Sequence, residues 1–367
     1  MRSCSSAVML LISVGWAQIV PNYPTEVFLG FVGYTNALPG CAPDVYTPFS
    51  SVKVVLQQDL PSTERLANII NFVGSYERYL NTTRAHDYHP LLLNPVLRSY
   101  FFTNDIFTVG LEINGTLESL PATDEAGETF ANPNYRLRFI PFHYLVATPN
   151  LIVQELLTLG FSRNADKTWI GTGAARIDYN ILKYEAKLTY LTTFHTRLFL
   201  ASFVFSNQYT DLPARSADGT ADMQNPKLRE TGYGAATGLR YSTFRWGIVE
   251  SVLEYEQNTD EVFGANTYSK FKFNAKWENQ YFTERFGYTL IVDYIRHVSD
   301  KYATGFGEET QLYETLARQE YRGDIMLILN LNRNVSIRPE FDILYRDLPG
   351  DRTYLKYRYW LHLHVLL

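Results

Sequence analysis

The sequence ends in "YLKYRYWLHLHVLL" (residues 354–367), and this stretch decides the fold. Every odd position from Leu355 to Leu367 is apolar or aromatic. The even positions carry most of the polar groups, namely Lys356, Arg358, His362 and His364. A period of two residues predicts a β-strand with one apolar face and one polar face. The function of the chain depends on what the apolar face contacts.

The same alternation recurs upstream, in residues 180–190, 248–256, 269–277, 286–296 and 335–345. These runs are longer than the five or six residues that are typical of strands in globular proteins. They match the roughly 9 to 11 residues that a tilted strand needs to cross a membrane. A secreted soluble β-sandwich would also alternate, but the length of so many runs favours strands that span a membrane.

Short and long connections alternate through most of the chain. Short ones such as "ATPN" (residues 147–150) and "NRN" (residues 332–334) alternate with long ones such as residues 207–228. Outer-membrane barrels are connected in this way, with short periplasmic turns and long extracellular loops. Counting strands from about Val96 to the end gives about thirteen. The upstream segments 26–34, 50–58 and 64–76 are further candidates. The sequence therefore predicts an all-β, transmembrane, antiparallel up-and-down β-barrel of 14–16 strands.

The chain divides into three parts. Residues 1–17 are predicted to be a cleaved signal peptide, because Arg2 precedes an apolar run that ends among small residues. Residues 96–367 are predicted to form the transmembrane barrel. Residues 18–95 have two interpretations, N-terminal strands or a plug or extension, since the apolar residues of 64–76 also fit a helical stripe. Cleavage would leave Cys41 as a single cysteine, which makes no internal disulfide.

Composition and motifs exclude several classes of function. The chain is 46% hydrophobic and 15% aromatic, and its net charge of -5 is spread along the sequence. Without a basic stripe, a nucleic acid is not expected as a partner. The sequence has no phosphate-binding loop, no Cys/His zinc spacing and no dinucleotide fingerprint. No cofactor and no metal are therefore expected.

The apolar faces are predicted to contact lipid. A Lys or Arg on the lipid face at the membrane midplane costs roughly 2–4 kcal/mol, and only a closed barrel satisfies every backbone group in hydrocarbon. On these residues the chain resembles a bacterial outer-membrane β-barrel of the porin-like class. In that class the last strand is apolar at alternate positions, as here at Tyr359, Leu361, Leu363 and Val365. The final residue is usually Phe, and Leu367 departs from that pattern.

The resemblance implies location in the bacterial outer membrane, contact with its lipid and lipopolysaccharide, and recognition of the C-terminal strand by the barrel assembly machinery. It implies passive diffusion of small polar or ionic solutes through a charged lumen, and no enzymatic activity. The alternative is a non-conducting surface barrel, an adhesin or structural anchor, that acts through its long extracellular loops. The oligomeric state and the solute are left open.

The polar faces supply the candidate pore-lining residues. We expect Glu254 to oppose Lys270, and Asp342 to oppose Lys356, so that acidic strands face basic ones as inward ion pairs. Such pairs would brace the wall or set a transverse field that selects solutes. The candidates are Lys183, Glu185, Lys187, Glu250, Glu254, Lys270, Lys272, Lys276, Arg338, Glu340, Asp342, Lys356, Arg358 and His362.

Other polar groups have simpler interpretations. His362 and His364 share a face, but without a third ligand nearby a structural role is favoured over a metal site. Asp293, His297 and Ser299 share a polar face, yet a Ser/His/Asp set is recognised by geometry, which sequence does not supply. The acidic loops at 115–133 and 298–319 are expected to be solvated. A sharper hypothesis is that one long loop folds into the barrel and narrows the pore. Its acidic residues would then favour the passage of cations.

Overall fold

The structure is a computed structural model of the whole chain, and the part of it described here has gaps. The predicted signal peptide, Cys41 and most of the acidic residues of the two acidic loops lie outside the described residues. The described residues are 26–35, 47–60, 66–79, 91–103, 106–119, 121–123, 129–131, 134–165, 168–170, 173–216, 222–243, 245–265, 267–279, 283, 285–299, 302–304, 311–313, 316–347 and 354–366.

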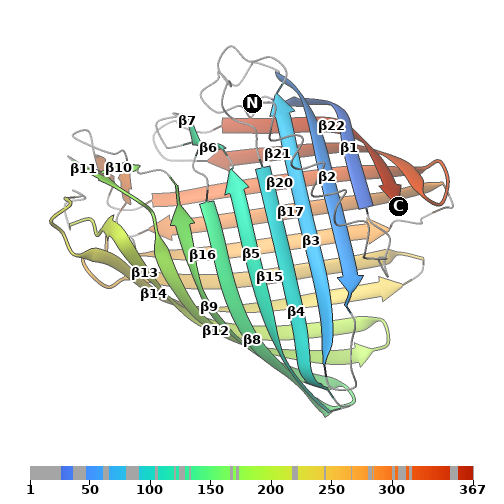
Figure 1. Cartoon of the computed structure of the whole chain (residues 1–367), viewed down its shortest axis with the longest axis horizontal. Coiled ribbons are helices and arrows are strands. Elements are labelled where there is room, and N and C mark those ends of the chain that lie inside the picture. The colour runs from blue at the N-terminus through green and yellow to red at the C-terminus, as the bar shows by residue number, and fades with distance from the viewer. Residues whose placement is uncertain are drawn as a thin grey trace.

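Sixteen of the described strands form one closed barrel, and each pairs antiparallel with its neighbours in chain order (Figure 1). This confirms the predicted all-β up-and-down barrel and sets its strand number at the upper end of the predicted range. The strands are β1 (Glu26–Thr35), β2 (Thr47–Asp59), β3 (Ala67–Tyr79), β4 (Leu91–Thr103), β5 (Phe107–Ser119), β8 (Asn134–Thr148), β9 (Leu151–Asn164), β12 (Tyr179–Thr193), β13 (Thr196–Pro213), β14 (Lys227–Thr243), β15 (Gly247–Asp260), β16 (Tyr268–Asn279), β17 (Phe286–Ser299), β20 (Leu316–Asn330), β21 (Val335–Asp347) and β22 (Tyr354–Leu366).

The barrel closes by pairing its first strand with its last. Residues of β1 pair with those of β22 from Glu26 opposite Leu366 to Thr35 opposite Arg358, with one register shift after Gly30. The C-terminal stretch that predicted the fold is therefore the closing strand. The three upstream candidate segments overlap β1, β2 and β3, so the segment 64–76, which also fitted a helical stripe, contributes to a strand that runs from Ala67 to Tyr79.

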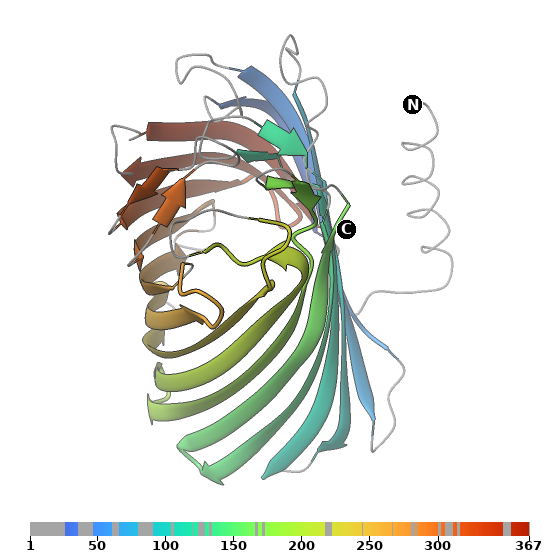
Figure 2. The same ribbon diagram turned by 90° about the vertical axis from the view of Figure 1, so that its left-hand side faces the viewer.

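The connections alternate in length around the ring. Turns such as the one between Thr148 and Leu151 are tight, while the connections at the other end are long. Three small hairpins lie in these long connections: β6 (Pro121–Thr123) with β7 (Thr129–Ala131), β10 (Thr168–Ile170) with β11 (Gly173–Ala175), and β18 (Tyr302–Thr304) with β19 (Gln311–Tyr313). All three gather at the same end of the barrel (Figures 1 and 2).

The strand residues alternate between two faces, as the sequence pattern predicts. Leu182, Tyr184 and Leu188 of β12 are 48%, 41% and 43% exposed, while the charged residues between them point to the opposite face. In a closed barrel one face lines the interior and the other surrounds it. Large apolar and aromatic side chains are exposed in the same way on strands all around the ring, which makes theirs the outer face. Among the described residues, no helix is long and apolar enough to cross a membrane.

Candidate functional site: the inner wall of the barrel

The candidate site is the inner wall, where the charged side chains gather. By strand register, all fourteen candidate residues lie on the face opposite the exposed apolar side chains. For Lys356 this placement rests on the backbone alone, because its side chain is outside the described part. The wall is not uniform, and four sectors differ in their chemistry.

The first sector is a ladder of acids against lysines on β15 and β16. Glu250 lies opposite Lys276, Glu254 opposite Lys272 and Glu256 opposite Lys270. The predicted pairing of Glu254 with Lys270 is therefore wrong by two residues, because β15 continues to Asp260 before the chain turns. A shift of two keeps every side chain on its face, so the acid strand still opposes the basic strand.

The ion pairs of this sector only partly follow that ladder. Glu250 Oε1 lies 3.1 Å from Nη1 of Arg240 on the other neighbouring strand, β14. Lys276 pairs along its own strand with Glu278. Among the described residues, the ion pairs of this sector form toward β14 and within β16, and none joins β15 to β16.

The second sector is a dense polar cluster on β20, β21 and β22. Asp342 lies opposite Arg358, so the predicted pairing with Lys356 is also wrong by two residues. Its Oδ1 lies 3.2 Å from Nε of Arg322. Glu340 Oε2 lies 3.3 Å from Nε2 of His362.

His364 extends the cluster to β1. Its Nδ1 lies 2.7 Å from Nη2 of Arg338, and its Nε2 lies 3.3 Å from Oε2 of Glu26. His362 and His364 thus contact carboxylates and a guanidinium. Within the described ranges no group of three His, Cys, Asp or Glu side chains is arranged to hold a metal ion.

The contacts recorded for Asp293, His297 and Ser299 on β17 are with other residues and not with one another. Asp293 Oδ1 accepts a hydrogen bond of 2.6 Å from Asn274 Nδ2. The ring of His297 lies against that of Tyr268, with 4.3 Å between the centroids. Ser299 is buried at the end of the strand.

The third sector, on β12, β13 and β14, combines lysines, phenylalanines and glycines. The rings of Phe199, Phe203 and Phe205 reach over the inner face of β14. A Cβ built on Gly234 would lie 2.3 Å from Cζ of Phe203, and one on Gly238 would lie 2.3 Å from Cε1 of Phe199. Any side chain at Gly234 or Gly238 would collide with a phenylalanine ring. The rings can lie over β14 because these two positions are glycines.

Two lysines of β12 lie over the same rings. Lys183 Nζ is 4.3 Å from the centroid of Phe203, and Lys187 Nζ is 4.4 Å from that of Phe199. Sequence reasoning identified the lysines but missed the aromatic rings and the glycines. The signal was present in "GYGAATG" (residues 232–238), where glycines recur at even spacing within a strand.

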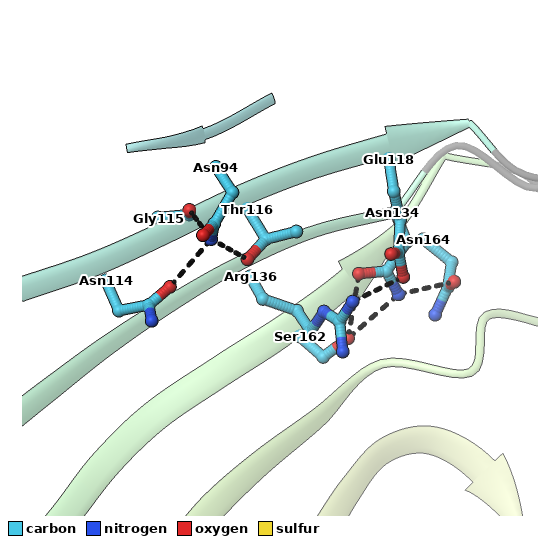
Figure 3. A network of polar contacts seen from close by, with 9 residues as sticks. All are labelled: Asn94, Asn114, Gly115, Thr116, Glu118, Asn134, Arg136, Ser162 and Asn164. Carbon is cyan, nitrogen blue, oxygen red and sulfur yellow. Dashed lines mark hydrogen bonds and ion pairs between the residues drawn. The ribbon is translucent and has the colours of Figure 1, made fainter. Parts of the chain in front are cut away.

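The fourth sector, on β4, β5, β8 and β9, carries amide groups as well as ion pairs (Figure 3). Asn94 Nδ2 donates to Asn114 Oδ1 at 3.1 Å, to the Gly115 carbonyl at 2.8 Å and to Thr116 Oγ1 at 3.0 Å. Asn134 Nδ2 donates to Ser162 Oγ at 2.9 Å and to Asn164 Oδ1 at 3.0 Å. Sequence reasoning did not single out this network, because isolated asparagines carry no periodic signal.

Two ion pairs join the strands of this sector. Arg136 Nη2 lies 2.6 Å from Glu118 Oε1, which links β8 to β5. Arg98 donates to Oε2 of Glu112 through both Nε and Nη2, which links β4 to β5. The acids on this side of the wall are therefore neutralised by neighbouring arginines.

Solvent reaches the inner wall. Arg98, Arg240 and Arg322 keep 38%, 46% and 52% of their side-chain surface exposed, although all three lie on the inner face. A sixteen-stranded barrel is wide enough to hold water unless chain fills it. The exposure of these guanidinium groups indicates that water occupies at least part of the interior.

One polar cluster lies on the outer face instead. His143 Nε2 is 3.7 Å from Glu155 Oε2, and the Tyr184 hydroxyl hydrogen-bonds the same carboxylate. These residues come from β8, β9 and β12 and lie among the exposed apolar side chains of the outer face. Sequence reasoning did not single out this cluster.

The chain was compared with known proteins. No family model matches the chain, and no curated protein matches it in sequence. Among solved structures, it is similar to Pseudomonas aeruginosa OccK3 (OpdO), with 10% identity, a TM-score of 0.47, and coverage of 94% of this chain and 96% of that one. It is also similar to Pseudomonas aeruginosa OccK5 (OpdH), with 6% identity, a TM-score of 0.48, and coverage of 94% and 98%.

A third similar structure is a BenF-like porin from Pseudomonas fluorescens Pf-5, with 8% identity, a TM-score of 0.46, and coverage of 94% of this chain and 98% of that one. The strand order and register of the chain itself, and not these distant likenesses, establish its fold. Its closed sixteen-stranded barrel has an apolar outer face and a charged, solvated inner wall.

Proposed function

We propose that the protein is a bacterial outer-membrane channel through which small polar or ionic solutes diffuse passively. The observation that carries the proposal is the separation of side chains by face in a closed sixteen-stranded barrel. Large apolar and aromatic residues are exposed on the outside, and ion-paired residues line an interior that solvent reaches. This arrangement suits a wall that faces lipid outside and water inside.

The order of strands supports a transverse polarity in the lumen. In a ring of sixteen, β8 lies eight places from β20, and β9 lies eight places from β21. Arg138 of β8 therefore lies across the interior from β20, which carries Asp324, while the lysines of β12 lie eight places from β22. Charges of opposite sign on facing walls favour polar and charged solutes over apolar ones.

The outer surface and the closing strand β22 suggest two partners of the protein. The outer face would contact outer-membrane lipid and lipopolysaccharide, and the barrel assembly machinery would recognise β22. The protein would act without a cofactor and without catalysing a reaction. These roles follow from the proposed location in the bacterial outer membrane and are part of the same proposal.

A planar bilayer measurement tests the proposal. The chain from Gln18 onward is refolded, inserted and recorded at single-channel level in KCl. Discrete current steps from protein with heat-modifiable mobility on gels would support a channel. Correctly folded barrels that carry no current would refute it. They would favour the second candidate, a surface barrel acting through its long connections, where the three hairpins lie.

A further inference from the structure

The two lysines of β12 that lie over phenylalanine rings differ in their electrostatic surroundings. Lys183 Nζ lies 2.9 Å from Oε2 of Glu185, two residues along the same strand, so its charge is neutralised. Lys187 has neutral residues opposite it on both sides, Gln154 on β9 and Ala201 on β13. Within the described part of the chain, no carboxylate lies within ion-pair distance of Lys187.

The position of the Lys187 ammonium group is set by a ring. Nζ lies 4.4 Å from the centroid of Phe199, a distance at which the ring quadrupole attracts a cation. The ring in turn lies over Gly238, where a Cβ would come within 2.3 Å of its Cε1. The glycine leaves room for the ring, and the ring attracts the ammonium group of Lys187.

The inner acids in the neighbouring sectors are largely engaged. Glu112 pairs with Arg98, Glu118 with Arg136 and Glu250 with Arg240. Lys187 is therefore a cation that contacts a ring, is partly exposed and has neutral residues opposite it on both neighbouring strands. A charge in this setting acts on passing ions through water, without an adjacent counter-charge to offset it.

We propose that Lys187 is a specificity-determining residue that raises the share of small anions in the solute flux. This inference rests on the proposed channel function and deepens it. The solutes favoured are small inorganic anions such as chloride, because a lysine ammonium is a point charge without the paired donors that bind planar groups such as carboxylates. Phe199 and Gly238 act as positioning residues.

The test is the reversal potential of the refolded channel in a KCl gradient across a planar bilayer. In K187Q the chloride-to-potassium permeability ratio should fall about twofold, the effect of one charge acting through water across part of the lumen. The matched control is the double variant K183Q/E185Q on the same strand. It removes a neighbouring ion pair without changing the net charge, so its permeability ratio should stay at the wild-type value.

A second variant tests the ring. F199L keeps the charge of Lys187 but frees its side chain to move toward Glu185, so its permeability ratio should fall between those of wild type and K187Q. A ratio equal to that of wild type would overturn the role of Phe199. All variants must show the heat-modifiable mobility of the wild-type barrel.

The outcomes separate this inference from the proposed function. A folded wild-type barrel that carries no current refutes the channel. A conducting wild type with an unchanged ratio in K187Q refutes the role of Lys187 and leaves the channel standing. An equal fall in K187Q and in K183Q/E185Q would also refute it, since the effect would then not depend on an unneutralised charge.

Discussion

Nη2 of Arg338 lies 2.7 Å from Nδ1 of His364. Because an arginine can only donate, Nδ1 must be the acceptor, and a neutral His364 then carries its proton on Nε2. That nitrogen lies 3.3 Å from Oε2 of Glu26. The contact thus links β21, β22 and β1 at the place where the ring closes, and it fixes the tautomer of a histidine that is only 4% exposed.

Removing either partner of this contact should destabilise the barrel. R338M or H364F should lower the free energy of unfolding by about 1.5–3 kcal/mol, the range for hydrogen bonds that involve a charged group. The measurement is urea unfolding in lipid vesicles, followed by tryptophan fluorescence. The double variant completes a cycle, and a coupling energy near zero would show that the two side chains do not depend on each other.

Gly234 should tolerate no side chain. In G234A the new Cβ would meet Cζ of Phe203 at 2.3 Å and the Tyr255 carbonyl oxygen at 2.4 Å. Overpacking of this kind costs about 1–3 kcal/mol, which vesicle unfolding would detect. The matched control is G323A, whose Cβ would meet only Ile343 Cγ2 at 3.2 Å. Equal stability of the two variants would contradict the close fit of the Phe203 ring.

Adjacent residues of β20 should respond differently to a new charge. Ile325 is 47% exposed on the outer face, and Met326 points to the inner face opposite Glu340. I325K should cost roughly 2–4 kcal/mol, because it places a charge in hydrocarbon. M326K should cost far less, because it faces water and an acid. Urea midpoints in vesicles compare the two, and a reversed order would show that the faces are assigned the wrong way round.

The polar cluster on the outer face should contribute little to stability. His143 and Glu155 lie 3.7 Å apart, and their attraction has to offset the loss of hydration in a lipid-facing position. We expect H143L/E155L to unfold at the same or a higher urea concentration than wild type. A marked loss of stability would mean that the cluster holds β8 to β9. The Y184F variant measures the contribution of the phenol separately.

The face of each strand was predictable, and the register of the hairpins was not. Alternation along β22 and its counterparts assigns side chains to faces without knowledge of the partner strand. The register depends on where a strand stops and how its turn is built. The predicted pairings of Glu254 and Asp342 were both wrong by two residues for this reason. A register shift of two residues leaves each side chain on the same face of the sheet, so the charged inner wall was still identified.

The aromatic and amide parts of the wall required the structure. Phe199 and Phe203 look like ordinary strand residues in sequence, and only the pairing of β13 with β14 places glycines beneath their rings. The three bonds of the Asn94 amide also depend on register, since they join β4 to β5. The ambiguity of residues 64–76 had a different cause, because a short apolar run fits a helix or a strand equally well.

The pairing of β1 with β22 has a consequence for the assembly of the barrel. β1 and β22 have one partner each until they pair with each other, so the sheet keeps two open edges until it closes. In a bilayer those edges would leave rows of unsatisfied backbone groups. A change that prevents β22 from pairing with β1 would therefore leave a sheet that cannot satisfy its backbone groups in hydrocarbon.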